Sequence, residues 1–148
     1  MQQMLLDRLR KEIPITSHMG IEVVRADNEE VSLSALLKPN INHNGTVFGG
    51  SLASVLLLSG WCLTEIRLKE WSLKGHVVVM KTELKYLHPV EGDFIATCSL
   101  HDEGEWQVFR QALESKKKAR IRLEGSILYQ KVAAVRFEGI YVAMLENF

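Results

Sequence analysis

A short stretch of the chain, residues 40–54, combines groups that could bind an anion and move a proton. Gly49 and Gly50 stand where a loop rich in Asn and Gly gives way to an apolar segment. Neither has a Cβ atom, so a ligand can approach the backbone closely. The unsatisfied N–H groups at a helix start would stabilise negative charge there. The alternative is that the two glycines serve close packing of a helix on a sheet.

Two side chains in the same stretch could handle a proton or hold a water. His43 is of the residue type that most often serves as a general base, although it could equally be an exposed loop residue. Ser54 could position a water, or could only bond back to the carbonyl four residues earlier. Among the carboxylates, Glu65 follows where the apolar segment turns polar, so we expect it to be solvated. Glu83 could be presented to a neighbouring subunit.

The segment after the glycines predicts one long helix over residues 50–70. Its side chains leave almost no polar face until Glu65, Arg67, Lys69 and Glu70. A helix that is apolar all round must be buried all round. At 1.5 Å per residue it would span about 30 Å, so the rest of the chain has to wrap it.

Alternation of apolar and polar residues elsewhere predicts mainly strands. We expect a helix over 2–12, strands over 21–25 and 30–37, a loop over 40–48, strands over 77–88, 94–101, 119–129 and 132–145, and a short inserted helix over 106–114. The last four strands are expected to form a meander. An antiparallel sheet wrapped around one buried central helix is an α+β arrangement and is that of the hotdog fold.

Length and charge restrict the class of protein. The 148 residues fit a single domain, 1–148. Lys plus Arg and Asp plus Glu both number 18, so the net charge is zero. A nucleic-acid binder would usually carry a basic excess, so we expect no nucleic-acid partner. Zero net charge also does not oppose self-association.

The remaining composition argues against metal and membrane sites. Cys62 and Cys98 lie far apart in apolar stretches and are expected to be two buried thiols. Neither has a second Cys or His at zinc-ligand spacing, so we expect no metal and no cofactor. The N-terminus does not read as a signal peptide. The apolar run 52–63 is interrupted by polar residues and is short for a membrane span. We therefore expect a cytoplasmic protein.

With the elements in place, an ordered set of motifs resembles the hotdog thioesterases, and among them the thioesterases of the YiiD C-terminal type. The resemblance covers about residues 13–145. Its motifs are the loop and helix start at 39–52 with a Phe before the Gly pair, Gly60-Trp61 inside the helix, Lys85-Tyr86-Leu87-His88-Pro89 at a strand end, and Phe137-Glu138-Gly139-Ile140-Tyr141-Val142 near the end of the last strand.

The resemblance implies hydrolysis of an acyl thioester on coenzyme A or on an acyl carrier protein, with the acyl carbonyl directed at the start of the helix. It places Asn42 at the loop position that orients the attacking water or the thioester in relatives; the alternative is an Asx turn. Two positions depart from the pattern. Phe48 stands where many relatives have His, and Leu57 stands where many have an Asp or Glu as nucleophile or base.

Substrate binding has further candidates along the chain. Leu57 and Trp61, with Met80, would suit an apolar acyl pocket, although core packing explains them equally. Phe48 is a further candidate for binding the substrate. Lys118 and Arg120 belong to the one basic cluster, which could hold the phosphates of coenzyme A or face an acidic carrier protein. The same cluster could only protect a solvated strand from mispairing.

Three functions remain open from the sequence. The first is an acyl thioesterase acting as a homodimer or homotetramer, with its site at the subunit boundary, as the resemblance implies. The second is a non-catalytic module that binds acyl thioesters or coenzyme A, which the apolar residue Leu57 favours. The third is a dehydratase of β-hydroxyacyl thioesters. That chemistry needs a paired His and acid, and no such pair is evident from spacing.

Overall fold

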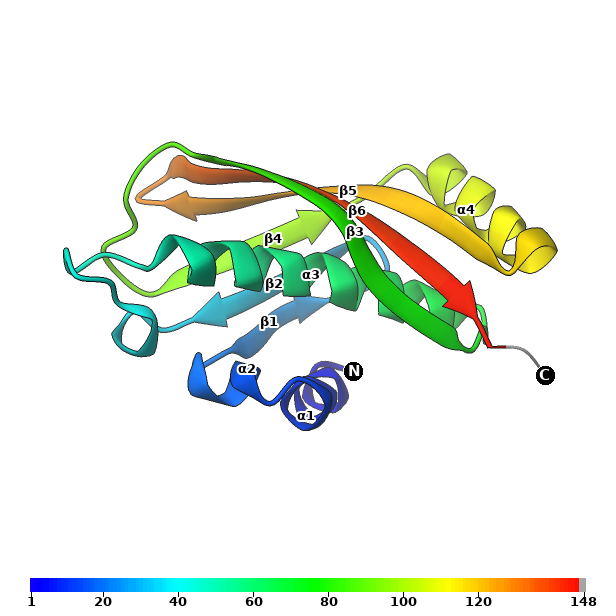
Figure 1. Cartoon of the computed structure of the whole chain (residues 1–148), viewed down its shortest axis with the longest axis horizontal. Helices are drawn as coiled ribbons and strands as arrows, with labels where there is room; N and C mark the ends of the chain where they lie inside the picture. Colours follow the sequence, from blue (N-terminus) through cyan, green and yellow to red (C-terminus); the bar gives the residue numbers. More distant parts are fainter. Residues whose placement is uncertain (147–148) are drawn as a thin grey trace.

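A computed structural model of the chain describes residues 1–146. One curved six-stranded antiparallel sheet wraps around a long central helix, α3, which confirms the α+β hotdog arrangement (Figure 1). The elements are α1 (Gln2–Glu12), α2 (Ile15–His18), β1 (Glu22–Ala26), β2 (Glu30–Ala35), a 3-10 turn (Lys38–Asn40), α3 (Gly49–Glu70), β3 (Gly75–Tyr86), β4 (Phe94–Ser99), α4 (Glu103–Lys116), β5 (Lys118–Tyr129) and β6 (Val132–Leu145).

The strand order corrects the expected meander. The strands lie in the order β1-β2-β4-β5-β6-β3, so β3 and β4 are consecutive in the chain but separated by two strands in the sheet. The connection after β3 crosses the end of the sheet to reach β4 (Figure 1). Alternation of side chains tells which face of a strand is buried, but it does not tell which strand lies beside it. Only β4, β5 and β6 follow one another as a meander.

We expected helix α3 to be buried all round, but it is buried on only most of its surface. A row of residues three or four positions apart is only partly buried: Gly50, Ala53, Ser54, Leu57 and Trp61. We call this row the open face of α3. The helix is long and apolar enough to cross a membrane, yet 72% of its most apolar window is buried in the protein. That burial is typical of a core helix.

Gly60 allows the centre of α3 to touch the sheet. Tyr141 of β6 donates a hydrogen bond from its hydroxyl to the Leu57 carbonyl at 2.7 Å. A Cβ atom on Gly60 would lie 2.5 Å from Cζ of the same ring, and closer still to its hydroxyl. The Gly60-Trp61 and Tyr141 motifs are therefore two halves of one contact. Cys62 and Cys98 are free and buried nearby, as expected, and burial raises the pKa of both thiols.

Two charged residues near the end of α3 are buried, and one of them, Glu65, was expected to be solvated. The side chain of Glu65 is 9% exposed and accepts from the Arg8 guanidinium of α1 at 2.8 Å. Burial raises the pKa of Glu65, and the bond to Arg8 opposes that rise. Arg8 also stacks over the Trp61 ring, 5.2 Å from its centroid. The Arg8 side chain of α1 therefore covers Glu65 and Trp61 of α3, at the end of the open face.

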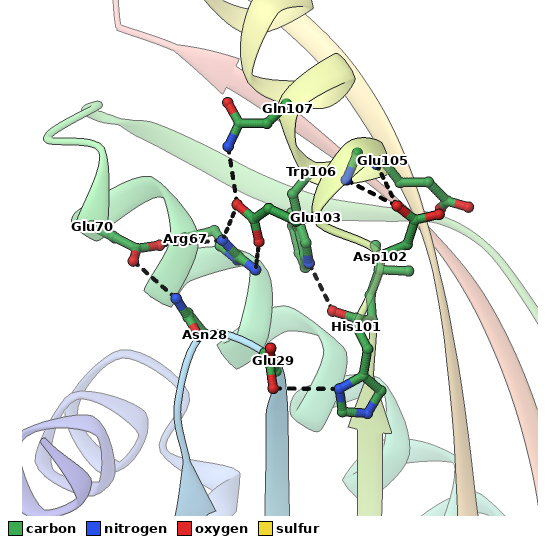
Figure 2. A network of polar contacts seen from close by, with 12 residues as sticks. Asn28, Glu29, Arg67, Glu70, His101, Asp102, Glu103, Glu105, Trp106 and Gln107 are labelled. Carbon is green, nitrogen blue, oxygen red and sulfur yellow. Dashed lines mark hydrogen bonds and ion pairs between the residues drawn. The ribbon is translucent and has the colours of Figure 1, made fainter.

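Arg67 is the second of these residues, and it attaches α4 to α3 (Figure 2). Its side chain is 2% exposed and donates from Nη1 and Nη2 to the Glu103 carboxylate, at 3.1 and 2.8 Å. The guanidinium lies over the Trp106 ring at 4.7 Å and the Trp71 ring at 5.9 Å. Helix α4 begins at Glu103 rather than Trp106 because Asp102 caps it, accepting from the N–H groups of its first turn.

Candidate functional site

The loop before α3 is shaped by Asn42. Its Oδ1 accepts from the backbone N–H groups of Asn44 at 2.8 Å and Thr46 at 3.1 Å. Its Nδ2 donates to the Thr46 hydroxyl at 2.8 Å. Gly45 has a φ of +80°, a conformation that favours glycine. The Asn42 amide is thus engaged inside the loop, and the Asx-turn interpretation accounts for all its contacts.

The first turn of α3 has no side-chain cap. Ser51 and Leu52 donate their N–H groups to the Phe48 carbonyl, at 2.9 and 3.2 Å. Within residues 1–146, no hydrogen bond is formed by the N–H groups of Gly49 and Gly50. These two donors, at the positive end of the helix dipole, are available to an anionic or strongly polarised oxygen.

The two glycines have different surroundings. A Cβ atom on Gly50 would lie 2.8 Å from Cζ of the Phe48 ring, and closer to Cε2. A side chain at position 50 would therefore displace the Phe48 ring, which is otherwise exposed. A Cβ atom on Gly49 would lie 3.6 Å from the nearest atom of Tyr86, which is ordinary contact. Packing inside the described chain therefore does not require glycine at position 49.

A pocket of about 230 Å³ opens beside Gly49 and is formed by the start of α3 and the segment after β3. Its lining residues are Val47, Gly49, Leu52, Tyr86, Leu87, His88, Pro89 and Val90. Tyr86 donates from its hydroxyl to the Gly49 carbonyl at 3.1 Å. Among the described residues that line this pocket, His88 is the one imidazole and none carries a carboxylate.

Sequence reasoning did not select Tyr86 and His88, which we interpreted as strand-end residues. They reach Gly49 because the crossing connection from β3 to β4 passes the start of α3 (Figure 1). The motif Lys85-Tyr86-Leu87-His88-Pro89 was the available signal, but its position beside the glycine pair follows only from the strand order.

The other candidate residues near the start of α3 do not line this pocket. Ser54 donates back to the Gly50 carbonyl at 2.8 Å, the structural alternative that we considered. His43 is exposed in the loop. Leu57 and Trp61 lie on the open face of α3, and the Trp61 indole donates to the Val77 carbonyl at 3.1 Å. An apolar row thus runs from the Gly pair along the helix.

Lys118 and Arg120 lie far from Gly49 within one chain. Lys118 pairs with Met144, which pairs with His76 near the start of β3, just after α3 ends. Gly49 is at the other end of α3, about 30 Å away by the rise of a 22-residue helix. A single protomer therefore does not bring these two cations to the glycine pair, and their role in substrate binding stays a prediction.

Strand β3 leaves one long edge of the sheet unpaired. It pairs only with β6 among the strands described, and all its residues except Gly75, Val77 and Leu84 are exposed. The exposed apolar members are Val78, Val79, Met80 and Tyr86. Glu83 lies on the same strand, exposed at this edge. A long apolar edge of this kind is a template for pairing with another strand.

Comparisons with known proteins agree with this fold. The family model described as "Putative thioesterase (yiiD_Cterm)" matches residues 2–145. A protein of unknown function from Chlorobaculum tepidum TLS is 31% identical with a TM-score of 0.93, over 98% of this chain and 94% of that one. The structure named as "the putative thioesterase from Shewanella oneidensis" is 28% identical with a TM-score of 0.83, over 96% and 99%.

A third solved structure, a protein of Pseudomonas aeruginosa named "Probable Thioesterase", is 18% identical with a TM-score of 0.84, over 97% of this chain and 95% of that one. At that identity the likeness concerns the fold alone. The family match spans both the uncapped glycine pair and the strand that places Tyr86 and His88 beside it. The chain therefore belongs to the YiiD C-terminal thioesterase family and has its hotdog fold.

Proposed function

We propose that the chain hydrolyses an acyl thioester carried by coenzyme A or by an acyl carrier protein. The observation that carries the proposal is the pair of unoccupied N–H groups of Gly49 and Gly50, at an uncapped helix start beside a pocket. Donors preorganised in this way stabilise the oxyanion of acyl transfer more than they stabilise the ground-state carbonyl.

The reaction follows from that placement. Water adds to the thioester carbon, and the carbonyl oxygen becomes an oxyanion that accepts from Gly49 and Gly50. The carbon–sulfur bond then breaks, giving a carboxylic acid and a thiolate. His88 takes the proton from the attacking water and returns it to the thiolate, because it is the one imidazole lining the pocket. Tyr86 holds the Gly49 carbonyl and so fixes the orientation of the first peptide groups of the helix.

The proposed site lies at the boundary between two copies of the chain. Pairing of two β3 strands would cover their free edges and bring a second copy alongside the open face of α3. Leu57 and Trp61 on that face, and Met80 on the edge, would then line the acyl chain. The smallest assembly that satisfies this arrangement is a homodimer, and a tetramer would add to it.

A binding module is the second candidate, and two observations favour it. The helix position where many relatives have an acid is the apolar residue Leu57, and the Asn42 amide is engaged inside its own loop. Such a protein would bind the thioester through the same glycine pair and release it intact.

Release of free thiol from a panel of acyl-CoA and acyl-carrier-protein thioesters distinguishes the two. His88→Ala should lower kcat about a hundredfold or more and change the pH profile of kcat. Gly49→Ala should fold normally, since its Cβ meets only ordinary contacts, and should lower kcat/KM at least about tenfold by narrowing the pocket. Asn44→Ala, in the adjacent exposed turn, is the matched control and should keep the wild-type rate.

Each outcome decides between the candidates. Turnover at the wild-type rate in Gly49→Ala would exclude a substrate that lies close against Gly49, as the proposed pocket requires. Turnover that persists in His88→Ala with an unchanged pH profile would exclude His88 as the base. Saturable binding of acyl-CoA that depends on Gly49, without release of thiol from any substrate, would establish the binding module.

A further inference from the structure

The first half of β5 has one edge that no strand covers. Of the residues of β5, only those from Glu124 to Ile127 pair with strand β4. The part from Lys118 to Leu123 pairs with β6 on one side and, within residues 1–146, with no strand on the other. An open edge of this kind offers the N–H and C=O groups of alternate residues to an added strand.

Helix α4 runs alongside this edge (Figure 1) and forms the opposite wall of a groove of about 760 Å³. Its inner face, with Trp106 and Phe109, packs into the core around Arg67. A second face borders the groove through residues three or four apart, among them Glu105, Val108 and Ala112. The Val108 side chain is 68% exposed. The α4 side of the groove is therefore apolar at Val108 and Ala112 and acidic at Asp102 and Glu105, and the β5 side has a backbone edge that no strand of the described residues covers.

The lining of the groove holds four cations, Lys116, Lys118, Arg120 and Arg122, and two acids near the start of α4, Asp102 and Glu105. Lys118, Arg120 and Arg122 alternate along β5 and so lie on one face of the strand, while Lys116 closes the end of α4. Arg122 is neutralised by Glu138 and Glu124. In the part of the chain that the structure describes, Lys116, Lys118 and Arg120 take part in no ion pair. Their charge can be met by an acidic ligand.

We propose that this groove binds an extended acidic peptide segment of a partner protein, which adds to β5 as a further strand. The six residues of the open edge would pair with a peptide of about 20 Å. Residues on one face of the peptide would be acidic, opposite Lys118 and Arg120. The alternating residues would be small and apolar, opposite Val108 and Ala112 of α4.

A peptide fits this groove better than a phosphorylated small molecule does. Phosphate groups would neutralise the cations but would leave the open edge of β5 and the exposed Val108 uncovered. An added strand satisfies the backbone groups, the apolar wall and the cations together. The groove also lies at the end of the molecule remote from Gly49, so peptide binding need not compete with the proposed hydrolysis.

The test uses the full chain and a labelled peptide of alternating Glu and Val, followed by fluorescence anisotropy at low salt. We expect saturable binding that weakens at least about tenfold in Arg120→Glu. Val108→Asp should weaken binding by a similar factor, because a carboxylate then lies in the apolar wall opposite an acidic peptide. Lys38→Glu, which reverses an exposed charge elsewhere, is the matched control and should bind like the wild type.

Two N-methylated peptides test whether the peptide binds as a strand. N-methyl groups on the odd residues block one set of backbone donors, and those on the even residues block the other set. One of the two peptides should lose binding and the other should keep it, because only alternate N–H groups face β5. Circular dichroism establishes that each protein variant is folded.

Three results would overturn the proposal. The first is no saturable binding of the alternating peptide up to millimolar concentration. The second is equal binding of both N-methylated peptides, which would exclude strand addition. The third is binding of coenzyme A that is weakened by Arg120→Glu while the peptide does not bind, which would assign the cations to the nucleotide of a substrate.

Discussion

The contact between Arg67 and Glu103 provides a sharp test of how α4 is held. Removing one partner of a buried ion pair costs about 3–5 kcal/mol when the remaining charge has no other partner. Here the Arg67 guanidinium is 2% exposed, but Glu103 is 57% exposed, so water already screens part of the interaction. Glu70, at 3.4 Å, remains as a second acceptor. We therefore expect Glu103→Ala to lower the free energy of unfolding by about 2 kcal/mol.

For a domain of this size, that loss corresponds to a decrease in Tm of roughly 4–8 °C. Urea unfolding followed by tryptophan fluorescence is the direct assay, because Trp71 and Trp106 lie against Arg67. Glu114→Ala is the matched control. Glu114 pairs with Arg110 on the exposed side of the same helix, and its loss should cost about 0.5 kcal/mol.

The pH dependence gives the same test a second readout. Arg67 lowers the pKa of the Glu103 carboxyl below its ordinary value of 4.5. A carboxyl whose pKa is lower in the folded state stabilises the fold above its unfolded pKa, and this stability is lost as the pH falls through the folded pKa. The difference between wild type and Glu103→Gln should therefore be present at pH 7 and shrink below about pH 4.5. Equal unfolding energies for Glu103→Ala and Glu114→Ala would refute this account of α4 docking.

Three more predictions follow from the packing of α3 and the edge of β3. Gly60→Ala should lower the free energy of unfolding by about 1–3 kcal/mol despite its better helix propensity, because its Cβ would collide with Tyr141; an unchanged urea midpoint would contradict the close contact. Arg8→Met should cost about 1 kcal/mol at pH 7 and less near pH 4, because burial raises the pKa of Glu65 and protonation removes its need for a counter-ion. An equal cost at both pH values would exclude that coupling. Met80→Lys should shift the proposed dimer toward monomer in light scattering by placing like charges at the β3 edge; a protein that is already monomeric at micromolar concentration would contradict the dimer itself.

Much of the fold could be predicted from the sequence because burial leaves a periodic pattern. Alternation predicted a strand over 77–88, which the structure has at Gly75–Tyr86, and an almost wholly apolar run predicted a helix over 50–70, which the structure has at Gly49–Glu70. What periodicity could not reveal is which elements become neighbours. The pairing of β3 with β6, the burial of Glu65 beneath Arg8 and the burial of Arg67 beneath α4 depend on contacts between residues distant in the chain.

Because sequence patterns do not show which elements become neighbours, only part of the candidate site could be predicted. The glycine pair could be selected because its residue type and position are informative by themselves. Asn42 proved to be engaged in its own loop, because an Asx turn and a water-holding amide need the same residue. His88 lies beside Gly49 only because the connection after β3 crosses the end of the sheet. No spacing within the chain carries that information.

The position of β6 between β5 and β3 has a consequence for the order of folding during synthesis. Strand β3 has no neighbour in the sheet until β6 has been made, about fifty residues later in the chain. Until then the apolar surface of α3 that faces β6, around Gly60, lacks its cover. A nascent chain that stops before Val132 would thus expose both an apolar helix and a long free strand. Closing the sheet through such distant contacts makes folding slow and favours protection by chaperones until β6 is complete.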